Sequence, residues 1–268
     1  MSRRRESVFL GAIPPVLVLW AWVVSLLTDY DVVADVDPSR AGMGPTAGLP
    51  FGTDHMGRDV FWRTVTASEA FVGPALVACA VALAIAVPLG ALAGYSGGTT
   101  ARAVRYLFDV VASVPRFVLV LLACMIYGSD PLVLATAAGA SYAPGLGQAV
   151  YARLEALRHA EFVLAARAHG LSDARILGRH LLWVNCRRLV GRHLLYLFGF
   201  FLILETTLSY IGGFGIEEPQ PSWGNMLAFE FGQHGLNPLA TLVPAAAIWL
   251  TVLGTVVVAD ALAEPGDV

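Results

Sequence analysis

Six apolar windows, each about as long as a membrane-crossing helix, constrain this sequence more than any other feature. A helix needs about 20 mostly apolar residues to cross a bilayer. The windows are residues 8–27, 71–95, 106–127, 131–151, 189–211 and 238–259. Hydrophobic residues make up 57% of the chain and charged residues only 14%, with a mean hydropathy of +0.67. The sequence therefore predicts an all-α, polytopic membrane protein with about six transmembrane helices.

The arginines are distributed unevenly between the two sides that six spans define. One side carries residues 3–5, Arg102, Arg105 and the arginines of 153–192, whereas the other carries chiefly Arg40, Arg58 and Arg63. Because arginine-rich short loops stay in the cytoplasm, we expect the first side and both termini to be cytoplasmic in a bacterial inner membrane.

The first window follows three arginines, as in a secretory signal, but it has full spanning length and no clear small-residue cleavage site. We expect it to be a retained anchor. Residues 1–70 then form an anchor helix with an external segment, and residues 71–268 form a core of five helices with a cytoplasmic loop at about 152–188.

Several function classes lack their signatures in this chain. A net charge of −3 and a pI near 6.0 give no basic groove for nucleic acid. No GxxxxGK[ST] motif for ATP and no HExxH motif for a metalloprotease occurs. The odd set of Cys79, Cys124 and Cys186 fits neither a disulfide framework nor a zinc site. His55 and His234 are scattered candidate ligands, so we expect no metal site and no catalytic residues.

The loop at about 152–188 is a polar, arginine-bearing insertion between two apolar windows. Alanines at 165, 166 and 168 would let another protein approach a short helix closely. Gly170 suits a left-handed helix end, and Ser172 or Asp173 can cap a second helix. His159, His169 and His180 are spaced by ten and eleven residues, which is typical of surface histidines. The pattern predicts a helix, a tight turn and a second helix that dock onto a partner.

Three segments carry a family resemblance. The alanine pair and Gly170 are similar to the "EAA" coupling loop of ABC-importer permeases. The stretch Gly52-Thr53-Asp54-His-Met-Gly57-Arg58-Asp59-Val resembles the "GTDxxGRDV" signature of the C-type permease subunit in dipeptide, oligopeptide and nickel importers. A second signature of that subunit, "PSWGNML", is matched by Pro221-Ser222-Trp223-Gly224-Asn225-Met-Leu before the last window.

This resemblance implies the type I ABC-importer permease fold and a non-catalytic subunit that forms a translocation path. The implied partners are a second permease in a heterodimer, one or two ATPase subunits that hold ATP and Mg²⁺, an external solute-binding protein and membrane lipid. This chain itself would hold no cofactor. The implied cargo is a dipeptide or oligopeptide, with nickel or another small solute as the alternative.

The sequence departs from the family pattern at three places. Leu164 stands where the motif has its glutamate, Trp183 where a proline closes it, and Glu69 where an arginine precedes the second window. The loop could dock through apolar contact, pair with an unusual ATPase, or belong to a copy that does not transport.

Charges near membrane depth give further expectations. Asp109 and Arg116 are seven residues apart, so they could pair on one face of a continuous helix. Glu205 could form an interhelical hydrogen bond or contact cargo, and the second use is also a weak hint of an ion-coupled secondary transporter. The acidic turn at Glu217 and Glu218 could be simply solvated or could favour cationic cargo.

In the first signature, Asp54 with Arg58 and Asp59 with Arg63 have the i, i+4 spacing of a surface helix. Elsewhere, glycines and prolines recur within the apolar windows, notably Gly90, Gly139 and Pro115. They are consistent either with close helix packing or with hinges for gating.

Overall fold

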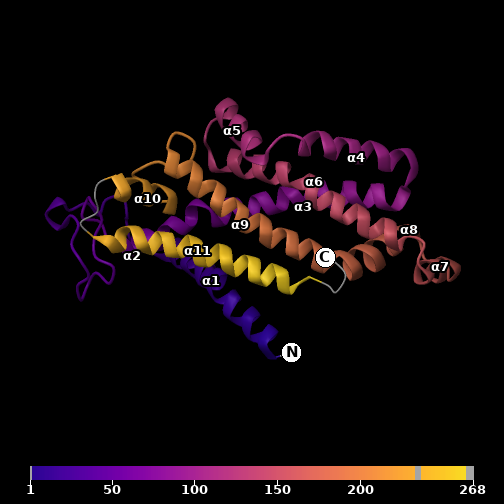
Figure 1. Ribbon diagram of the computed structural model, residues 1–268, viewed down its shortest axis with the longest axis horizontal. Coiled ribbons are helices and arrows are strands. Elements are labelled where there is room, and N and C mark those ends of the chain that lie inside the picture. Colours follow the sequence, from indigo (N-terminus) through magenta and orange to yellow (C-terminus); the bar gives the residue numbers. More distant parts are fainter. Residues whose placement is uncertain (1, 233–236, 264–268) are drawn as a thin grey trace.

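The chain forms an elongated bundle of helices (Figure 1). The computed structural model describes residues 2–232 and 237–263. Within them the helices are joined by turns and irregular segments, and the β pairing consists of two isolated bridges. In chain order the elements are α1 (Ser2–Leu27), η1 (Pro38–Arg40), α2 (Val60–Thr66), η2 (Ala67–Ala70), α3 (Val72–Ser96), α4 (Gly98–Ala112), α5 (Arg116–Tyr127), α6 (Pro131–Leu157), α7 (Glu161–Ala168), α8 (Asp173–Arg175), η3 (Ile176–Cys186), α9 (Arg187–Ile211), α10 (Trp223–Gly232) and α11 (Pro238–Ala261).

Within those described residues, four helical stretches are long and apolar enough to cross a membrane: Phe9–Leu27, Val60–Ser96, Asp173–Ile211 and Pro238–Ala261. They contain four of the six predicted windows. The window at 131–151 lies in the 27-residue helix α6, which is long enough to span but less apolar than these four. Much of α6 is buried against α3, so fewer of its side chains face lipid.

The window at 106–127 is not one straight helix, which corrects the prediction. It comprises the end of α4 and all of α5, and these two helices meet at an angle of 76°. Pro115 lies at the break, where its missing N–H and fixed φ prevent a continuous helix. As a result Asp109 and Arg116 do not pair. The amide of Gln148 donates to Asp109 at 2.9 Å instead, and Arg116 lies over the ring of Tyr142.

Helices α3 and α6 pack closely because glycines remove side chains at their contact. A Cβ at Gly139 would lie 2.4 Å from the carbonyl oxygen of Ala78, and one at Gly90 would lie 2.5 Å from that of Gly147. Both distances are far below van der Waals contact, so only glycine fits there. These two positions therefore serve close packing, the first of the two readings of their sequence pattern.

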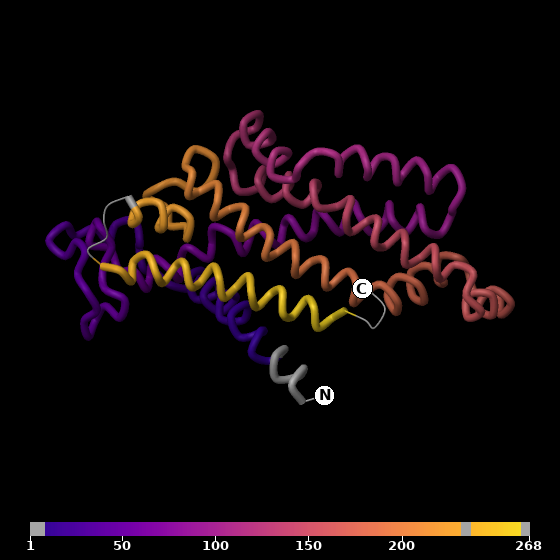
Figure 2. The backbone as a smooth tube through the Cα atoms, viewed as in Figure 1, coloured from indigo at the N-terminus to yellow at the C-terminus, as the bar shows by residue number. Residues whose placement is uncertain are grey.

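The bundle has a different kind of loop at each end (Figure 2). Residues 28–59, together with α2 and α10, lie at one end, and α7 and α8 lie at the other. A core cluster near the first end includes Phe71, Phe201 and Trp223. A second cluster connects α3 and α6 with the buried residues Val163 and Ile176 of the opposite loop. The packing therefore fixes both loops to the same helices.

Candidate functional site

The loop between α6 and α9, residues 158–186, folds as predicted around a left-handed glycine. Gly170 has φ of +77°, and a Cβ placed there would meet no atom within 4 Å. The N–H of Gly170 donates to the carbonyl of Arg167 and that of Leu171 to the carbonyl of Ala166. These two bonds form a Schellman motif, which ends α7 and reverses the chain.

The second part of this loop differs from a simple capped helix. Ser172 occupies the N-cap position, but its hydroxyl makes no capping hydrogen bond. α8 has only three residues and continues into η3, which is wound as a π-helix. The carboxylate of Asp173 instead accepts a hydrogen bond from the Tyr95 hydroxyl at the end of α3. His180 is half-buried in η3.

The loop buries one apolar face and exposes another. Val163, Ile176 and Leu181 are fully buried against α3 and α6. By contrast, Leu164 is 53% exposed and Trp183 is 67% exposed. Ala165 and Ala168 are also exposed, whereas Ala166 is half-buried. Leu171, which could have joined the exposed patch, packs inward with the core cluster. We call Phe162, Leu164, Ala165 and Ala168 the outer face of α7.

A polar contact that the sequence did not indicate holds this loop to α3. The Arg167 guanidinium donates to the Tyr95 hydroxyl at 2.8 Å and lies 5.5 Å from the centre of its ring. Arg167 also lies 3.4 Å from the Asp173 carboxylate. Tyr95 is 72 residues from Arg167, so no local spacing could have revealed the contact.

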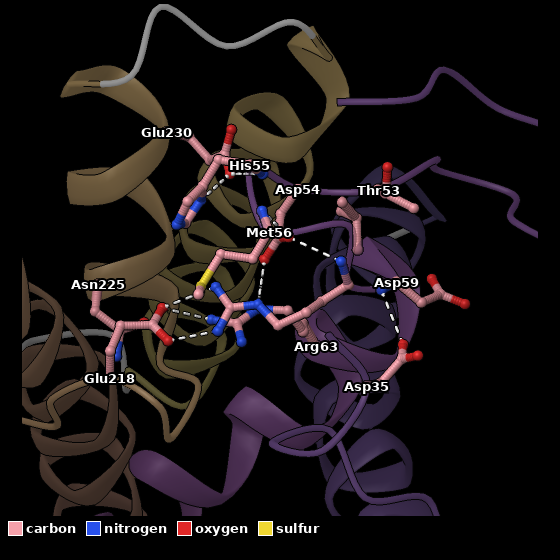
Figure 3. A network of polar contacts seen from close by, with 12 residues as sticks. Asp35, Thr53, Asp54, His55, Met56, Asp59, Arg63, Glu218, Asn225 and Glu230 are labelled. Carbon is pink, nitrogen blue, oxygen red and sulfur yellow. Dashed lines mark hydrogen bonds and ion pairs between the residues drawn. The ribbon is translucent and has the colours of Figure 1, made fainter. Parts of the chain in front are cut away.

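At the other end of the bundle, the "GTDxxGRDV" segment supplies a buried ionic network (Figure 3). Arg58 donates from Nε to Asp54 at 2.7 Å and from Nη1 to Glu218 at 2.6 Å. Arg63 donates from Nη2 to the same Glu218 at 2.8 Å. Burial disfavours the charged guanidinium, yet hydrogen bonds and charges from Glu218 and Asp54 hold the pKa of Arg58 above its ordinary value. The network thus joins segments 160 residues apart.

This geometry corrects the expectation of a surface helix with two i, i+4 pairs. Asp54 does pair with Arg58, but in a turn in which its Oδ1 also accepts the N–H groups of Met56 and Arg58. Asp59 does not pair with Arg63. It caps α2 by accepting from the N–H of Phe61, and burial raises its pKa.

Glycines and a threonine of the same signature shape this turn. Gly57 has φ of +80°, and a Cβ there would lie 1.8 Å from the carbonyl oxygen of Asp37. Gly52 has φ of +71°, and its Cβ would lie 2.2 Å from the carbonyl oxygen of Met43. Thr53 accepts from the N–H of Met43 at 2.9 Å. These residues therefore build the loop that places the two arginines.

The "PSWGNML" segment packs the start of α10 against α2 and α9. The N–H of Ser222 donates to the Asn225 side chain, whose own amide donates to the carbonyl of Gln220 at 2.8 Å. The Trp223 indole donates to the carbonyl of Thr64 in α2 at 2.9 Å. Pro221 is buried at the start of this segment, and Gly224 lies directly against the backbone of α9. Both signatures therefore stabilise one end of the bundle.

Comparison with known proteins agrees with these features. Residues 86–264 match the family described as "Binding-protein-dependent transport system inner membrane component". The chain belongs to this family. It is 30% identical to the dipeptide transport system permease protein DppC of Alkalihalophilus pseudofirmus, over 93% of this chain and 81% of that protein. It is 28% identical to the glutathione transport system permease protein GsiD of Pectobacterium atrosepticum, over 99% and 87%. The corresponding values for the oligopeptide transport system permease protein OppC of Bacillus subtilis are 26%, 99% and 86%.

Membership makes the chain an inner-membrane, non-catalytic component of a transport system that works with a binding protein. The predictions of an all-α permease and of its family are therefore confirmed. The positions of the loop and the two signatures now have a structural explanation, whereas their functional roles stay predictions.

The possible pathway residue Glu205 is wholly enclosed by the chain. It has no exposed surface, and the Ser209 hydroxyl donates to its Oε1 at 2.6 Å. Ser222 from the "PSWGNML" segment lies beside this carboxylate, whose Oε2 is buried and has no hydrogen-bond partner among the described residues. The structure therefore places Glu205 in the contact between α9 and the segment before α10. Glu205 does not lie on an open path in this structure.

The acidic turn and Glu69 also have local partners. The charge of Glu218 is neutralised by the arginines that bind it. The carboxylate of Glu217 accepts a hydrogen bond from the N–H of Gly213 at 3.1 Å. Glu69 accepts a hydrogen bond from the Ser25 hydroxyl and so connects η2 with α1. Neither arrangement leaves two free carboxylates side by side to attract cationic cargo.

Three potential metal ligands are closer together than the sequence indicated. One ligand atom each from Asp54, His55 and Glu230 lies within 4.8 Å of the others, while His234 falls outside the described residues. Asp54 is already bound by Arg58 and approached by Arg63, and Glu230 accepts from His55 Nδ1 at 2.8 Å. Two guanidinium groups beside a carboxylate oppose a divalent cation. The residues therefore fit an ionic network better than a metal centre.

Proposed function

We propose that this chain is the permease subunit of an ATP-driven importer of dipeptides or oligopeptides. The observation that carries the proposal is the loop of residues 158–186, whose inner face is fixed to α3 and α6 and whose outer face is apolar and exposed. A patch of this kind on a short helix suits a groove on another protein. That protein would be an ATPase subunit that holds ATP and Mg²⁺.

The proposed orientation places this loop and both termini in the cytoplasm. The arginine distribution supports it, because the loop end of the bundle carries far more arginines than the network end. The network end would then face outward and receive cargo from the solute-binding protein. A second permease of similar fold would complete the path as a heterodimer.

In this mechanism, ATP-driven closure of the ATPases moves α7. Because Val163 and Ile176 are buried against α3 and α6, displacement of the loop is transmitted to the helices that line the path. The ATPase must bind one arrangement of the bundle better than the other, since a ligand shifts an equilibrium only through such a difference. The loop residues Leu164, Ala165, Gly170, Asp173 and Trp183 would serve this coupling, along with Ala166, Ser172 and His180.

Peptides are the proposed cargo because the relatives named above are described as dipeptide, glutathione and oligopeptide permeases. Nickel is the second candidate from the family resemblance, but the cluster around His55 is occupied by arginines. An ion-coupled transporter is disfavoured because Glu205 is enclosed.

The test is uptake by proteoliposomes that contain this permease with its candidate partner permease, ATPases and binding protein. We expect labelled tri-alanine to accumulate only with ATP on the ATPase side and with the binding protein present. A complex whose ATPase lacks its P-loop lysine is the matched control. Uptake of Ni²⁺ without peptide uptake would contradict the proposed cargo, and uptake independent of ATP would contradict the proposed class.

A further inference from the structure

Arg116 is a charged residue in an unusual position, at the break between α4 and α5. It is the first residue of α5, directly after Pro115, and its side chain is exposed on this chain. Its guanidinium carbon lies 4.7 Å from the centre of the Tyr142 ring on α6. A Cβ on Gly145 would come within 3.3 Å of its Nη2. The ring and the glycine therefore hold the guanidinium in a defined place.

The guanidinium lies far from both ends of the bundle, measured along the helices. Tyr142 packs in a cluster with Ala82 of α3 and Leu197 of α9. Ala82 is ten residues from the start of α3 and fourteen from its end, which corresponds to roughly 15 and 21 Å along the helix axis. α3 is part of a stretch apolar enough to cross a membrane. The guanidinium therefore lies beside the middle of this helix, and either end of α3 is farther away than an arginine side chain extends by snorkelling.

Arg116 also has no counter-ion among the side chains that the structure describes. Across residues 9–231 and 237–263, no carboxylate lies within ion-pair distance of its guanidinium, and Asp109 accepts from Gln148 instead. Charged residues at membrane depth are costly and face a water-filled cavity or a partner. Other polar groups occur nearby, because His193 on α9 is close enough to interact with the charge of Arg116, and Gln148, three residues after Gly145 on α6, donates to Asp109. The exposed guanidinium thus marks a wet surface of the bundle.

We propose that Arg116 binds the C-terminal carboxylate of the peptide while it passes along the translocation path, and that Tyr142 positions the guanidinium. This inference rests on the proposed function. A planar guanidinium matches a carboxylate with two parallel hydrogen bonds. The guanidinium also sits beside the N-terminal end of the half-helix α5, whose dipole favours a negative group. Every peptide with a free C-terminus offers that group whatever its side chains, as a permease for varied peptides requires.

The test compares tri-alanine with its C-terminal amide in proteoliposomes of the assembled complex, with the binding protein saturated by each peptide. In the wild type, we expect the amide to be imported about tenfold more slowly, the size of effect expected for one lost charged hydrogen bond. Arg116→Gln should slow tri-alanine import about tenfold and leave amide import unchanged. Arg116→Lys keeps the charge without the planar fork, and it should fall between the two.

Arg105→Gln is the matched control, because Arg105 of α4 lies 5.4 Å from the centre of the Tyr151 ring, which belongs to the same helix α6 as Tyr142 but is nearer its loop end. It should import both peptides like the wild type. Equal slowing of acid and amide by Arg116→Gln would overturn the inference and indicate a structural role or an ion pair with the second permease. Unchanged tri-alanine import would overturn it as well. Failure of the wild type to import tri-alanine would instead refute the proposed cargo.

Discussion

The two ends of this permease reverse the usual distribution of residues in opposite ways. At the network end, Arg58 and Arg63 are each only 1% exposed, although arginine is rarely buried. At the loop end, Leu164 and Trp183 are more than half exposed. Both buried guanidinium groups pair with carboxylates of the chain, although Nε and Nη1 of Arg63 make no hydrogen bond among the described residues. The exposed apolar side chains stay uncovered. The first end therefore pairs its charges within the chain, whereas the second exposes the apolar face that we propose docks onto a partner.

The sharpest test of this comparison is which side of the membrane each end faces. A reporter fused after Arg175 should be cytoplasmic, and one fused after Glu218 should be external. The physical reason is the arginine excess in the short segments near the loop end. Alkaline phosphatase and fluorescent-protein fusions measure the two sides independently. Finding both positions on one side would refute the two-ended topology.

Breaking the buried network should have the largest effect on stability. Arg58→Ala removes one of the two arginines that Asp54 and Glu218 share and leaves only Arg63 beside them. Removing one member of a buried ion pair costs about 3–5 kcal/mol. Thermal unfolding in detergent and abundance in membranes would both fall. Arg40→Ala is the matched control, because Arg40 makes two ion pairs but its side chain is 37% exposed, which predicts a loss of at most about 1 kcal/mol. Similar losses for the two variants would show that the network is not a buried one.

A pair of glycine variants compares the two ends directly. Gly57→Ala at the network end adds a Cβ 1.8 Å from the Asp37 carbonyl oxygen at positive φ, so we expect a loss of about 2–4 kcal/mol. Gly170→Ala at the loop end has the same sign of φ but open space around it. It should cost only about 1 kcal/mol, from backbone strain alone. Thermal unfolding of both variants measures the difference.

Gly170→Val extends this comparison from stability to docking. A β-branched residue disfavours the left-handed turn more strongly than alanine, so the turn that orients α7 should loosen. Membrane insertion should be normal, whereas co-purification of the ATPase should fall. Recovery of the ATPase at the wild-type yield would mean that the turn does not orient the docking surface.

The sequence predicted the features that depend on local pattern. Apolar length identified the helices now seen as α1, α3, α9 and α11, and Gly170 identified the turn after α7. The break at Pro115 could have been recognised, since proline disrupts a helix interior, but the bilayer tolerates proline often enough that a straight span remained acceptable. Spacing also misplaced the partners of Asp59, because a residue that begins a helix can cap it instead of pairing with the next turn.

Contacts between distant segments could not be predicted in this way. The network depends on Glu218, which is 160 residues from Arg58, and the loop contact depends on Tyr95, which is 78 residues from Asp173. Such contacts arise from how the helices pack, and no spacing within one helix encodes them. The enclosure of Glu205 is a similar case, because only the packed helices show it. Its possible role in the pathway stays a prediction.

The central claim is that the outer face of α7 docks onto an ATPase through apolar contact. Leu164→Asp places a carboxylate on that face, and burial of a leucine contributes about 1.5–3 kcal/mol. Leu164→Met is the matched control, because it keeps an apolar side chain of similar volume. The decisive measurement is co-purification and stimulated ATP hydrolysis, with equal amounts of permease and ATPase in membranes. We predict that the aspartate variant loses either the ATPase or its coupling to transport at normal permease abundance, while the methionine variant retains both. An aspartate variant that matches the wild type in both measurements would contradict the claim.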